Sequence, residues 1–318
     1  MKIQEDIIPK VPTEELEKEL TPELFVRKTN KGSNEIYIFS YDQAPNLFKE
    51  VGRLRELTFR ESGGGTGKSI DIDKYDTAKI PFKQLIVWDP DGKNIIGGYR
   101  FFLGKDDHKD KNGVPVTPTS KLFKFSQDFI DKYWDKTIEL GRSFVQPAYQ
   151  PSINRKGIFS LDNLWDGLGT LVVDNPEMKY FFGKFTMYPS FDQKARDLIC
   201  YFLQNYFPDT DNLVTPIYPI EIKTDIEELK SHFKLNYYNE DYRNLIKALR
   251  NLGENIPPLV NAYMNLSTTM KIFGSSHNSH FGDVYETGML ITIADIFEEK
   301  KKRYITPYIE IKKGAKNK

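Results

Sequence analysis

Hydrophobic and polar positions change their period several times along the chain, and each change predicts a new element. Residues 34–42 alternate and are rich in β-branched and aromatic side chains, which predicts a strand. Residues 44–62 place apolar side chains at helical spacing, which predicts an amphipathic helix that ends at a run of glycines. Residues 83–104 form two apolar runs around a Pro-Asp-Gly turn, which is typical of a hairpin.

The same periodicities extend over most of the remaining chain. They predict strands at 137–145, 179–190, 270–278 and 286–295, and helices at 120–134, 160–175, 191–207, 225–235, 239–252 and 257–266. This succession indicates an α/β fold, a central mixed and twisted sheet flanked by helices, with an α+β carboxy-terminal extension. The sequence shows no internal repeat and no low-complexity linker. We expect an amino-terminal arm, a core, an extension packed on the core and a disordered basic tail, at residues 1–33, 34–208, 209–305 and 306–318.

Composition excludes several classes of function but does not identify one. The 318 residues include 45 Lys+Arg and 45 Asp+Glu, so net charge gives no argument for nucleic acid, and we expect no nucleic-acid partner. The single cysteine, Cys200, excludes a disulfide framework and a multi-cysteine metal site. The amino terminus lacks the apolar segment of a signal peptide, so we expect a cytoplasmic protein. His277 and His280 with Asp283 lack a further evident ligand, so no metal site is expected.

The glycine run "GGGTGKS" at 63–69 invites comparison with a phosphate-binding P-loop. That pattern requires a glycine five residues before Gly67, and the position holds Ser62. A P-loop also follows a strand and opens a helix, whereas this run follows a predicted helix and precedes "IDIDKYD". The sequence therefore favours a helix-ending connector over a nucleotide site.

Charged residues recur at the edges of the predicted elements. They are Arg55 in the first helix, Asp71, Asp73 and Asp76 after the glycines, Arg100 in the hairpin, and Glu139 and Arg142 in one strand. The simplest interpretation of the aspartates is an ionic network that fastens the helix and loop to the sheet. Positions 139 and 142 differ by an odd number, so they point to opposite faces unless a bulge intervenes. For Glu139, a functional and a structural role are equally supported.

As an ordered set, these motifs resemble the ornithine- and glycine-lipid N-acyltransferases, which are GNAT-like and share the motifs with acyl-homoserine-lactone synthases. "RLRELTFRESGGGTGKSIDIDKYD", "QLIVWDPDGKNIIGGYR" and "PPLVNAYMNL" resemble the glycine-lipid branch most closely. The resemblance covers roughly residues 35–295, and its matching motif residues are Arg55, Phe59, Asp73, Asp76, Arg100, Glu139 and Arg142. Two departures stand out: Asp71 replaces a frequent Glu, and residues 275–288 offer no functional residue to carry over.

The resemblance implies a GNAT-like acyltransferase that moves a (3-hydroxy)fatty acyl group from acyl carrier protein to the amino group of glycine or ornithine in aminolipid biosynthesis. It implies no permanently bound cofactor; the acyl-phosphopantetheine of acyl carrier protein, or acyl-CoA, is the donor. The loop "VQPAYQPSINRKG" lacks a G-x-G pyrophosphate motif, which favours the carrier protein. An aminolipid product suggests peripheral contact with the inner membrane leaflet. An acetyl-CoA-dependent enzyme acting on a small amine and an inactive GNAT-like binding module remain alternatives.

Aminolysis of a thioester needs a base and a group that stabilises the oxyanion. Glu139 is the expected base, and Arg100 or Arg142 offers a fork for the carboxylate of an amino-acid acceptor. A backbone N–H near Ser143 and Phe144 is the expected oxyanion donor. The remaining expected substrate-binding residues are Arg55, Phe59, Asp73 and Asp76, with Lys68 in a mobile glycine connector near the phosphate of the donor.

Overall fold

The computed structural model describes residues 4–106, 109–150, 153 and 155–316. These residues form two compact units, each assembled from separate stretches of chain. Unit 1 draws on residues 1–107, 136–179 and 297–318, and unit 2 on residues 108–135 and 180–296. This division differs from the sequential boundaries expected above, because stretches far apart in the sequence return to the same unit.

Unit 1 contains five strands in the order β1-β2-β3-β4-β6, and every neighbouring pair is antiparallel. They are β1 (Phe25–Lys28), β2 (Glu35–Phe39), β3 (Lys83–Asp89), β4 (Asn94–Leu103) and β6 (Thr137–Val145). The predicted strand at 34–42, the hairpin at 83–104 and the strand at 137–145 are therefore confirmed. The arm is more than a covering segment, because its residues supply the edge strand β1.

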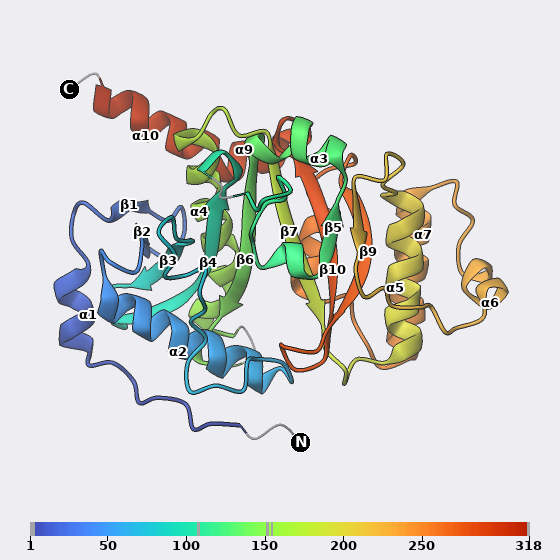
Figure 1. Ribbon diagram of the computed structural model, residues 1–318, viewed down its shortest axis with the longest axis horizontal. Helices are drawn as coiled ribbons and strands as arrows, with labels where there is room; N and C mark the ends of the chain where they lie inside the picture. The colour runs from blue at the N-terminus through green and yellow to red at the C-terminus, as the bar shows by residue number, and fades with distance from the viewer. Residues whose placement is uncertain (1–3, 107–108, 151–152, 154, 317–318) are drawn as a thin grey trace. The chain divides into compact units, whose positions relative to one another are not determined.

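The two faces of this sheet carry different partners (Figure 1). Gln84 and Arg100 lie opposite each other in the register and so share a face, which α2 (Pro45–Glu61) and the segment after it cover. Leu85 points to the other face, where α4 (Ser160–Asp174) packs so closely that a Cβ on Gly167 would lie 2.5 Å from Leu85. The charged motif residues thus face α2, and the apolar face belongs to α4.

Both ends of the chain are fastened to unit 1. The arm forms α1 (Thr13–Glu19), and the Glu19 carboxylate accepts hydrogen bonds from the first free amides of α2, at Asn46 and Leu47. At the other end, α9 (Glu298–Tyr304) and α10 (Thr306–Lys316) pack on α4, and the Tyr308 hydroxyl bonds Asp174 at 3.0 Å. The expectation of a disordered tail is wrong for residues 306–316, because buried Tyr308 anchors them as a helix.

Unit 2 contains three antiparallel strands in the order β7-β10-β9, with a separate two-stranded sheet. They are β7 (Tyr180–Met187), β10 (Val284–Thr292) and β9 (Lys271–Asn278), with β5 (Phe123–Phe125) paired to β8 (Val214–Pro216). The helices are α3 (Gln127–Lys132), α5 (Gln193–Tyr206), α6 (Ile226–Ser231), α7 (Tyr238–Asn251) and α8 (Pro258–Met264). Over the described residues of both units, short 3-10 helices lie at Gly104–Asp106, Thr119–Lys121, Trp134–Lys136, Pro147–Tyr149, Arg155–Phe159 and Ile293–Asp295.

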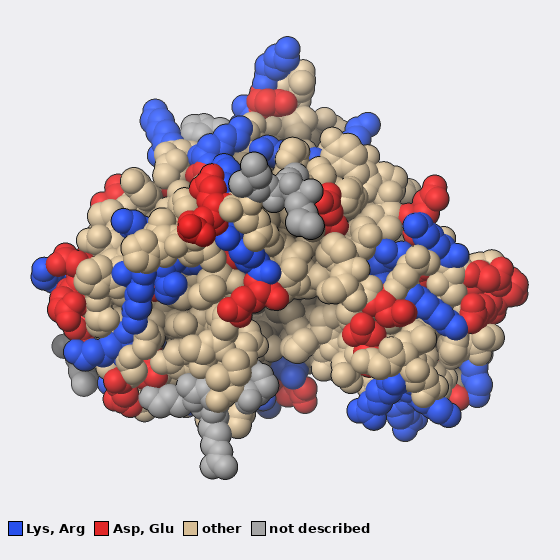
Figure 2. All heavy atoms as spheres, turned by 90° about the horizontal axis from the view of Figure 1, so that it is seen from below, with Lys and Arg blue, Asp and Glu red and all other residues tan. Residues whose placement is uncertain are grey.

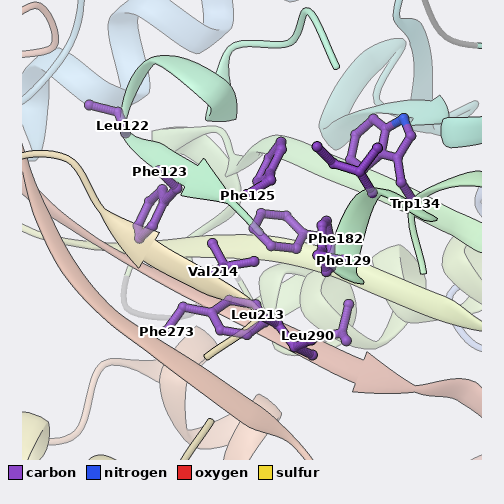
Figure 3. Close-up of a cluster of buried hydrophobic side chains, with 11 residues drawn as sticks. Leu122, Phe123, Phe125, Phe129, Trp134, Phe182, Leu213, Val214, Phe273 and Leu290 are labelled. Atoms are coloured by element: carbon purple, nitrogen blue, oxygen red, sulfur yellow. The ribbon is translucent and has the colours of Figure 1, made fainter. Parts of the chain in front are cut away.

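The predicted helix at 120–134 is largely wrong. Phe123 and Phe125 are buried on either side of exposed Lys124, so this stretch has the two-residue period of a strand. The Ser126 side chain then accepts a hydrogen bond from the Phe129 amide and starts the much shorter α3. The apolar residues of the segment still reach the core, an aromatic cluster that includes Phe125, Phe129, Trp134, Phe182 and Phe273 (Figure 3).

The face of the molecule drawn in Figure 2 shows no field of a single sign. Figure 2 shows Lys and Arg interspersed with Asp and Glu over one face of the molecule, consistent with a net charge of zero. Among the described helices, none combines the length and the apolar run that crossing a bilayer requires. The site must therefore be sought in local side-chain arrangements.

Candidate active site

A β-bulge in β6 resolves the odd spacing between Glu139 and Arg142. In the β4–β6 register, Gly98 pairs with Phe144 and Arg100 pairs with Gly141, so β6 carries one extra residue. Arg142 sits in this bulge with φ of 50°, in the left-handed region that non-glycine residues seldom adopt. The bulge turns the Arg142 side chain to the Arg100 face, the face that Glu139 also occupies.

A buried ionic network joins α2, the aspartate segment and the sheet. Asp71 accepts from Arg55 at 3.0 Å and lies 2.8 Å from Nε of Arg142. Asp76 contacts both Arg55 and Arg100, at 3.3 and 3.2 Å. Asp73 binds Arg100 at 2.9 Å. The network interpretation of the aspartates is therefore supported by each of these contacts.

The electrostatics of the network favour the charged forms of Asp71, Asp73 and Arg100. Burial opposes ionisation of Asp71, but the guanidinium groups of Arg142 and Arg55 outweigh it and hold its pKa well below the usual range. Burial similarly opposes charge on Asp73, and Arg100 lowers the pKa of that carboxyl. In return, the aspartates raise the pKa of Arg100 against its burial. Asp71 and Asp73 therefore stay ionised at neutral pH and pair with the arginines that contact them.

Glu139 lies on the same face as Arg100. It lies opposite Phe102 in the register, and its residue is only 2% exposed. Phe102 stacks on Phe82, which lies under the Arg100 guanidinium at 5.1 Å. Burial, then the charges of Asp73 and Glu139, raise the pKa of Tyr75 to about 12. Glu139 is thus a buried carboxyl group opposite Phe102, on the face that carries the ionic network.

The remaining predicted substrate-binding residues lie around this face. The Phe59 ring lies 6.0 Å from the Arg142 guanidinium, and its residue is 8% exposed. Ser143 follows Arg142 in the irregular stretch of the β4–β6 register, whereas Phe144 pairs regularly with Gly98. A Cβ on Gly97 would lie 2.3 Å from the Phe144 carbonyl oxygen, so only glycine fits opposite the bulge.

The glycine loop is fastened through its own amides. The buried Glu56 carboxylate accepts from the amides of Thr66 and Gly67 at 2.9 and 2.8 Å and from the Thr66 hydroxyl at 2.7 Å. Arg60 neutralises the same carboxylate at 2.9 Å. Gly63, Gly65 and Gly67 all have positive φ, which lets the loop turn its amides toward Glu56. A side-chain carboxylate takes the place that a phosphate would take in a P-loop.

The amino-terminal segment holds the loop from the other side. The Glu5 amide donates to the Gly67 carbonyl at 2.8 Å, the Ile8 amide donates to Ser69, and the Glu5 carboxylate accepts from the Ser69 amide. These contacts argue against the mobile connector expected from the sequence. Lys68 itself is exposed, and its backbone carbonyl accepts from Arg60 at 2.7 Å.

The histidine cluster shows no metal site. His277 Nε2 lies 3.4 Å from Asp283 Oδ1, and both side chains are largely exposed. Within residues 4–106, 109–150, 153 and 155–316, no group of three or more His, Cys, Asp or Glu side chains is arranged to hold an ion.

Two buried polar residues with well-defined partners were not predicted from the sequence. Glu56 and Gln84 are buried polar residues, and Gln84 donates to Asp76 at 3.4 Å. Glu56 falls one turn from Arg60 on the predicted helix, and this i,i+4 pair is the one signal that could have revealed it.

Comparison with known proteins gives this geometry a class. A family model described as an acetyltransferase (GNAT) domain matches residues 54–158, the range that holds the network, Glu139 and the bulge. A glycine N(alpha)-acyltransferase of Bacteroides thetaiotaomicron is 53% identical over 307 residues, covering 96% of this chain and 91% of the relative. A glycine N(alpha)-acyltransferase of Phocaeicola vulgatus is 50% identical, covering 96% and 94%.

A solved CoA-dependent acyl-homoserine lactone synthase, bound to SAM and isopentyl-CoA, is a more distant neighbour. It shares 10% identity with a TM-score of 0.38, over 84% of this chain and 85% of that one, and this likeness carries no argument.

The matched domain and the α/β architecture define a GNAT-type acyltransferase, so the predicted fold class is confirmed. The chain belongs to the glycine N(alpha)-acyltransferase family. It is an N-acyltransferase. This confirms the predicted activity class and the predicted resemblance to the glycine branch. An inactive GNAT-like binding module is no longer an alternative.

Proposed function

We propose that this protein transfers a (3-hydroxy)fatty acyl group from an acyl carrier protein thioester to the amino group of glycine, with ornithine as the second candidate acceptor. The names of the two close relatives support glycine. The observation that carries the chemistry is the bulge in β6, because it gathers Glu139 and Arg142 on one face beside Arg100. The product would enter aminolipid synthesis, with peripheral contact at the inner membrane leaflet.

In this proposal the neutral amine nitrogen attacks the thioester carbonyl carbon and a C–N bond forms. Glu139 takes the proton from that nitrogen, directly or through one water. A backbone N–H at Ser143 or Phe144, beside the bulge, donates to the oxyanion of the tetrahedral intermediate. The intermediate then collapses and the C–S bond breaks. The pantetheine sulfur takes up the proton that Glu139 had accepted, directly or through water, and leaves as a thiol.

The arginines and aspartates have a positioning role in this scheme. Arg55 and Arg100 are almost fully enclosed and each contacts two aspartates, so both hold the 71–76 segment over the face. The Arg142 side chain is 17% exposed and is paired with Asp71. We therefore assign the fork of Arg142 to orienting the bulge rather than to binding the acceptor carboxylate.

The carrier-protein donor follows from the segment after β6. Residues 146–157 contain Pro147 and Pro151 and no G-x-G motif, so a CoA pyrophosphate would find no glycine cradle there. A carrier protein presents pantetheine on one phosphate and needs no such cradle. Exposed Lys68 is the cation that we assign to that phosphate or to the carrier-protein surface.

The proposal is tested by product analysis with purified protein. Each donor, 3-hydroxyacyl carrier protein or acetyl-CoA, is paired with each acceptor, glycine or ornithine, and the N-acyl product is identified by mass spectrometry. We expect N-(3-hydroxyacyl)glycine from the carrier-protein donor. Turnover with acetyl-CoA and none with the carrier protein would replace the proposal by the acetyltransferase alternative.

Replacing the proposed base gives a second test. Glu139→Gln keeps the shape of the side chain but removes its basic oxygen, so we expect kcat to fall by about 10² to 10⁴-fold. Glu177→Gln is the matched control, since Glu177 is an exposed partner of Lys105 in the same unit. Equal activity of the two variants would remove Glu139 from the mechanism.

A further inference from the structure

A small cavity in unit 2 has no part in the mechanism described so far. It lies between α7 and the segment that leads into α8, and its volume is about 140 Å³. Its lining residues come from these two helices and the turn that joins them: Tyr242, Ile246, Arg250, Asn255, Ile256 and Asn261. Asn261 belongs to "PPLVNAYMNL", a stretch that carries the resemblance to the glycine branch and has no place in the proposed chemistry.

Two polar groups at this cavity are hydrogen-bond donors that retain capacity. Oδ1 of Asn261 already accepts from the Tyr242 hydroxyl and, at 3.1 Å, from Nδ2 of Asn265. These two contacts fix the orientation of the Asn261 amide, so its Nδ2 keeps two N–H groups. Within the described residues, neither this Nδ2 nor the Arg250 guanidinium donates to a protein group. A ligand that is an anionic hydrogen-bond acceptor therefore suits the cavity.

The Arg250 side chain is not needed to complete the end of its helix. The Leu249 carbonyl accepts from the amides of Leu252 and Glu254, each at 2.9 Å. The Arg250 carbonyl accepts from the Gly253 amide at 3.0 Å. Gly253 has a φ of 76°, which lets the turn fold back on these carbonyls. The exposed guanidinium of Arg250 can therefore meet an external anion.

Arg250 also ends a stripe of positive charge along α7. Arg243, Lys247 and Arg250 are spaced at i, i+4 and i+7, so they share one helix face, and all three are exposed. The opposite face is buried through Leu245 and Leu249. At 1.5 Å per residue the stripe extends over about 10 Å, which is longer than one phosphate or carboxylate group. The stripe therefore fits a surface that displays several anions.

The acidic residues near the stripe have partners of their own. Glu240 contacts Lys234 at 2.6 Å. Asp241 is buried, and its carboxylate accepts from a tyrosine hydroxyl and from two backbone amides. Beyond the helix, Glu254 accepts from the Asp192 amide at 3.1 Å. The three cations of the stripe have no ion pair within the described residues, so their charge is available to an external partner.

We propose that the cavity and the stripe bind an anionic phospholipid surface, with the phosphate of one head group in the cavity. Arg250 and Nδ2 of Asn261 contact oxygens of that phosphate, and Arg243 and Lys247 contact neighbouring head groups. Two isoleucines line the cavity beside these donors, which favours an anion attached to a carbon skeleton over a free phosphate ion. This inference rests on the membrane contact in the proposed function, because it assigns a surface to that contact.

Vesicle sedimentation with the full-length protein tests the inference. Wild type is mixed with vesicles of phosphatidylcholine alone or of phosphatidylcholine and phosphatidylglycerol. We expect binding to the mixed vesicles only, weakened about fivefold by Lys247→Gln, which removes one cation near the surface. Lys124→Gln is the matched control, because Lys124 is an exposed lysine of β5 in the same unit with no ion pair among the described residues.

Two substitutions at the cavity separate a phosphate site from general attraction. Arg250→Gln removes a cation and a phosphate contact, so we expect binding to be about tenfold or more weaker. Asn261→Asp keeps the shape of the side chain but replaces the donor with a negative charge, so we expect a similar loss. Thermal unfolding checks that each variant is folded. Binding by Arg250→Gln and Lys247→Gln equal to that by Lys124→Gln would overturn the inference.

Inorganic phosphate and acyl carrier protein are also titrated into wild type. Phosphate bound through Arg250 without binding to either kind of vesicle would overturn the lipid assignment. Carrier-protein binding that is lost in Lys247→Gln, with no vesicle binding, would overturn it as well. If wild type acylates glycine from a soluble donor but binds no anionic vesicle, this inference fails and the proposed function stands. If vesicles bind through Arg250 and no acyl product forms, the proposed function fails and the inference stands.

Discussion

Unit 1 and unit 2 both bury opposite charges against a sheet, but they pair them differently. In unit 1, three arginines meet three aspartates at 2.8 to 3.3 Å, and Arg55 and Arg100 each touch two carboxylates. In unit 2, Lys184 of β7 stands 3.5 Å from Glu286 of β10. The first arrangement gives each carboxylate a charged donor, whereas the second leaves an oxygen of Glu286 without a hydrogen bond among the described residues.

The difference separates two uses of buried charge. A closely hydrogen-bonded network fixes the backbone that carries it, and here it fixes the 71–76 segment over Glu139. A loose pair leaves part of its hydrogen-bonding capacity unused. The motif residues of unit 1 belong to the first kind, since they form a supporting framework.

The largest expected effect comes from breaking the network at its centre. Arg55→Ala removes the guanidinium that pairs with Asp71 and Asp76, so two buried carboxylates lose a partner. We expect a loss of about 3–5 kcal/mol in the free energy of unfolding. Urea denaturation monitored by circular dichroism measures it.

The double variant Lys184→Met/Glu286→Gln sharpens the same comparison. It removes both charges of the loose pair and leaves neither one unpaired, so we expect a change below about 1 kcal/mol. A loss as large as that of Arg55→Ala would show that both clusters are structural.

An effect smaller than that of Arg55→Ala is expected at the glycine loop. Glu56→Gln converts a charged acceptor into an amide whose nitrogen cannot accept the Thr66 or Gly67 amide. We expect a loss of about 1–3 kcal/mol and faster amide hydrogen exchange at Thr66 and Gly67. Unchanged exchange in this variant would mean that the contacts of the Glu5–Ile8 segment suffice to hold the loop.

Acid should weaken unit 1 through the aspartates. The pKa values of Asp71 and Asp73 in the folded protein lie below the ordinary 3.8, so their stabilisation is complete above that pH. It is lost as pH falls below 3.8 toward the lower folded pKa values. Unfolding free energies at pH 7, 4 and 3 test this, with Asp71→Asn flattening the decline and exposed Asp128→Asn leaving it unchanged.

Asp166 contributes to the pH dependence with the opposite sign. Burial raises the pKa of Asp166 from 3.8 to about 6, although its hydrogen bonds from Asn30 oppose the shift. Its contribution therefore favours the folded state below pH 3.8 and declines as pH rises to about 6. Asp166→Asn should remove this component of the pH dependence, and a stability curve identical to wild type between pH 4 and 6 would contradict the assignment.

Periodicity predicted most of the elements because each one buries a single face. The helix ending at the glycines and the 83–104 hairpin appear within two residues of their expected bounds. The 120–134 stretch failed because Leu122, Phe125 and Phe129 match helical spacing while Phe123 and Phe125 match a strand. Only the partner strand β8, distant in sequence, decides between the two.

The site was predicted in part. Arg55, Arg100, Arg142 and the aspartates were expected together, and the structure brings them together. Whether β6 contains a bulge could not be decided from the sequence, because an extra residue in β6 becomes visible only in its register with β4. The assignment of the arginines to substrate contact stays a prediction. The sequence did not reveal that Arg55 and Arg100 each contact two carboxylates. The catalytic role of Glu139 stays a prediction.

In the glycine loop, any phosphate would have to compete with Glu56 for the Thr66 and Gly67 amides. Glu56 is tethered to the loop by the chain itself, so its effective concentration at the Thr66 and Gly67 amides exceeds that of a free phosphate in solution. A diffusing nucleotide would have to displace this resident anion and leave it buried beside Arg60 alone. The amides of the loop are thus already occupied by a carboxylate of the same chain. A short glycine pattern in the sequence does not show which anion such amides bind.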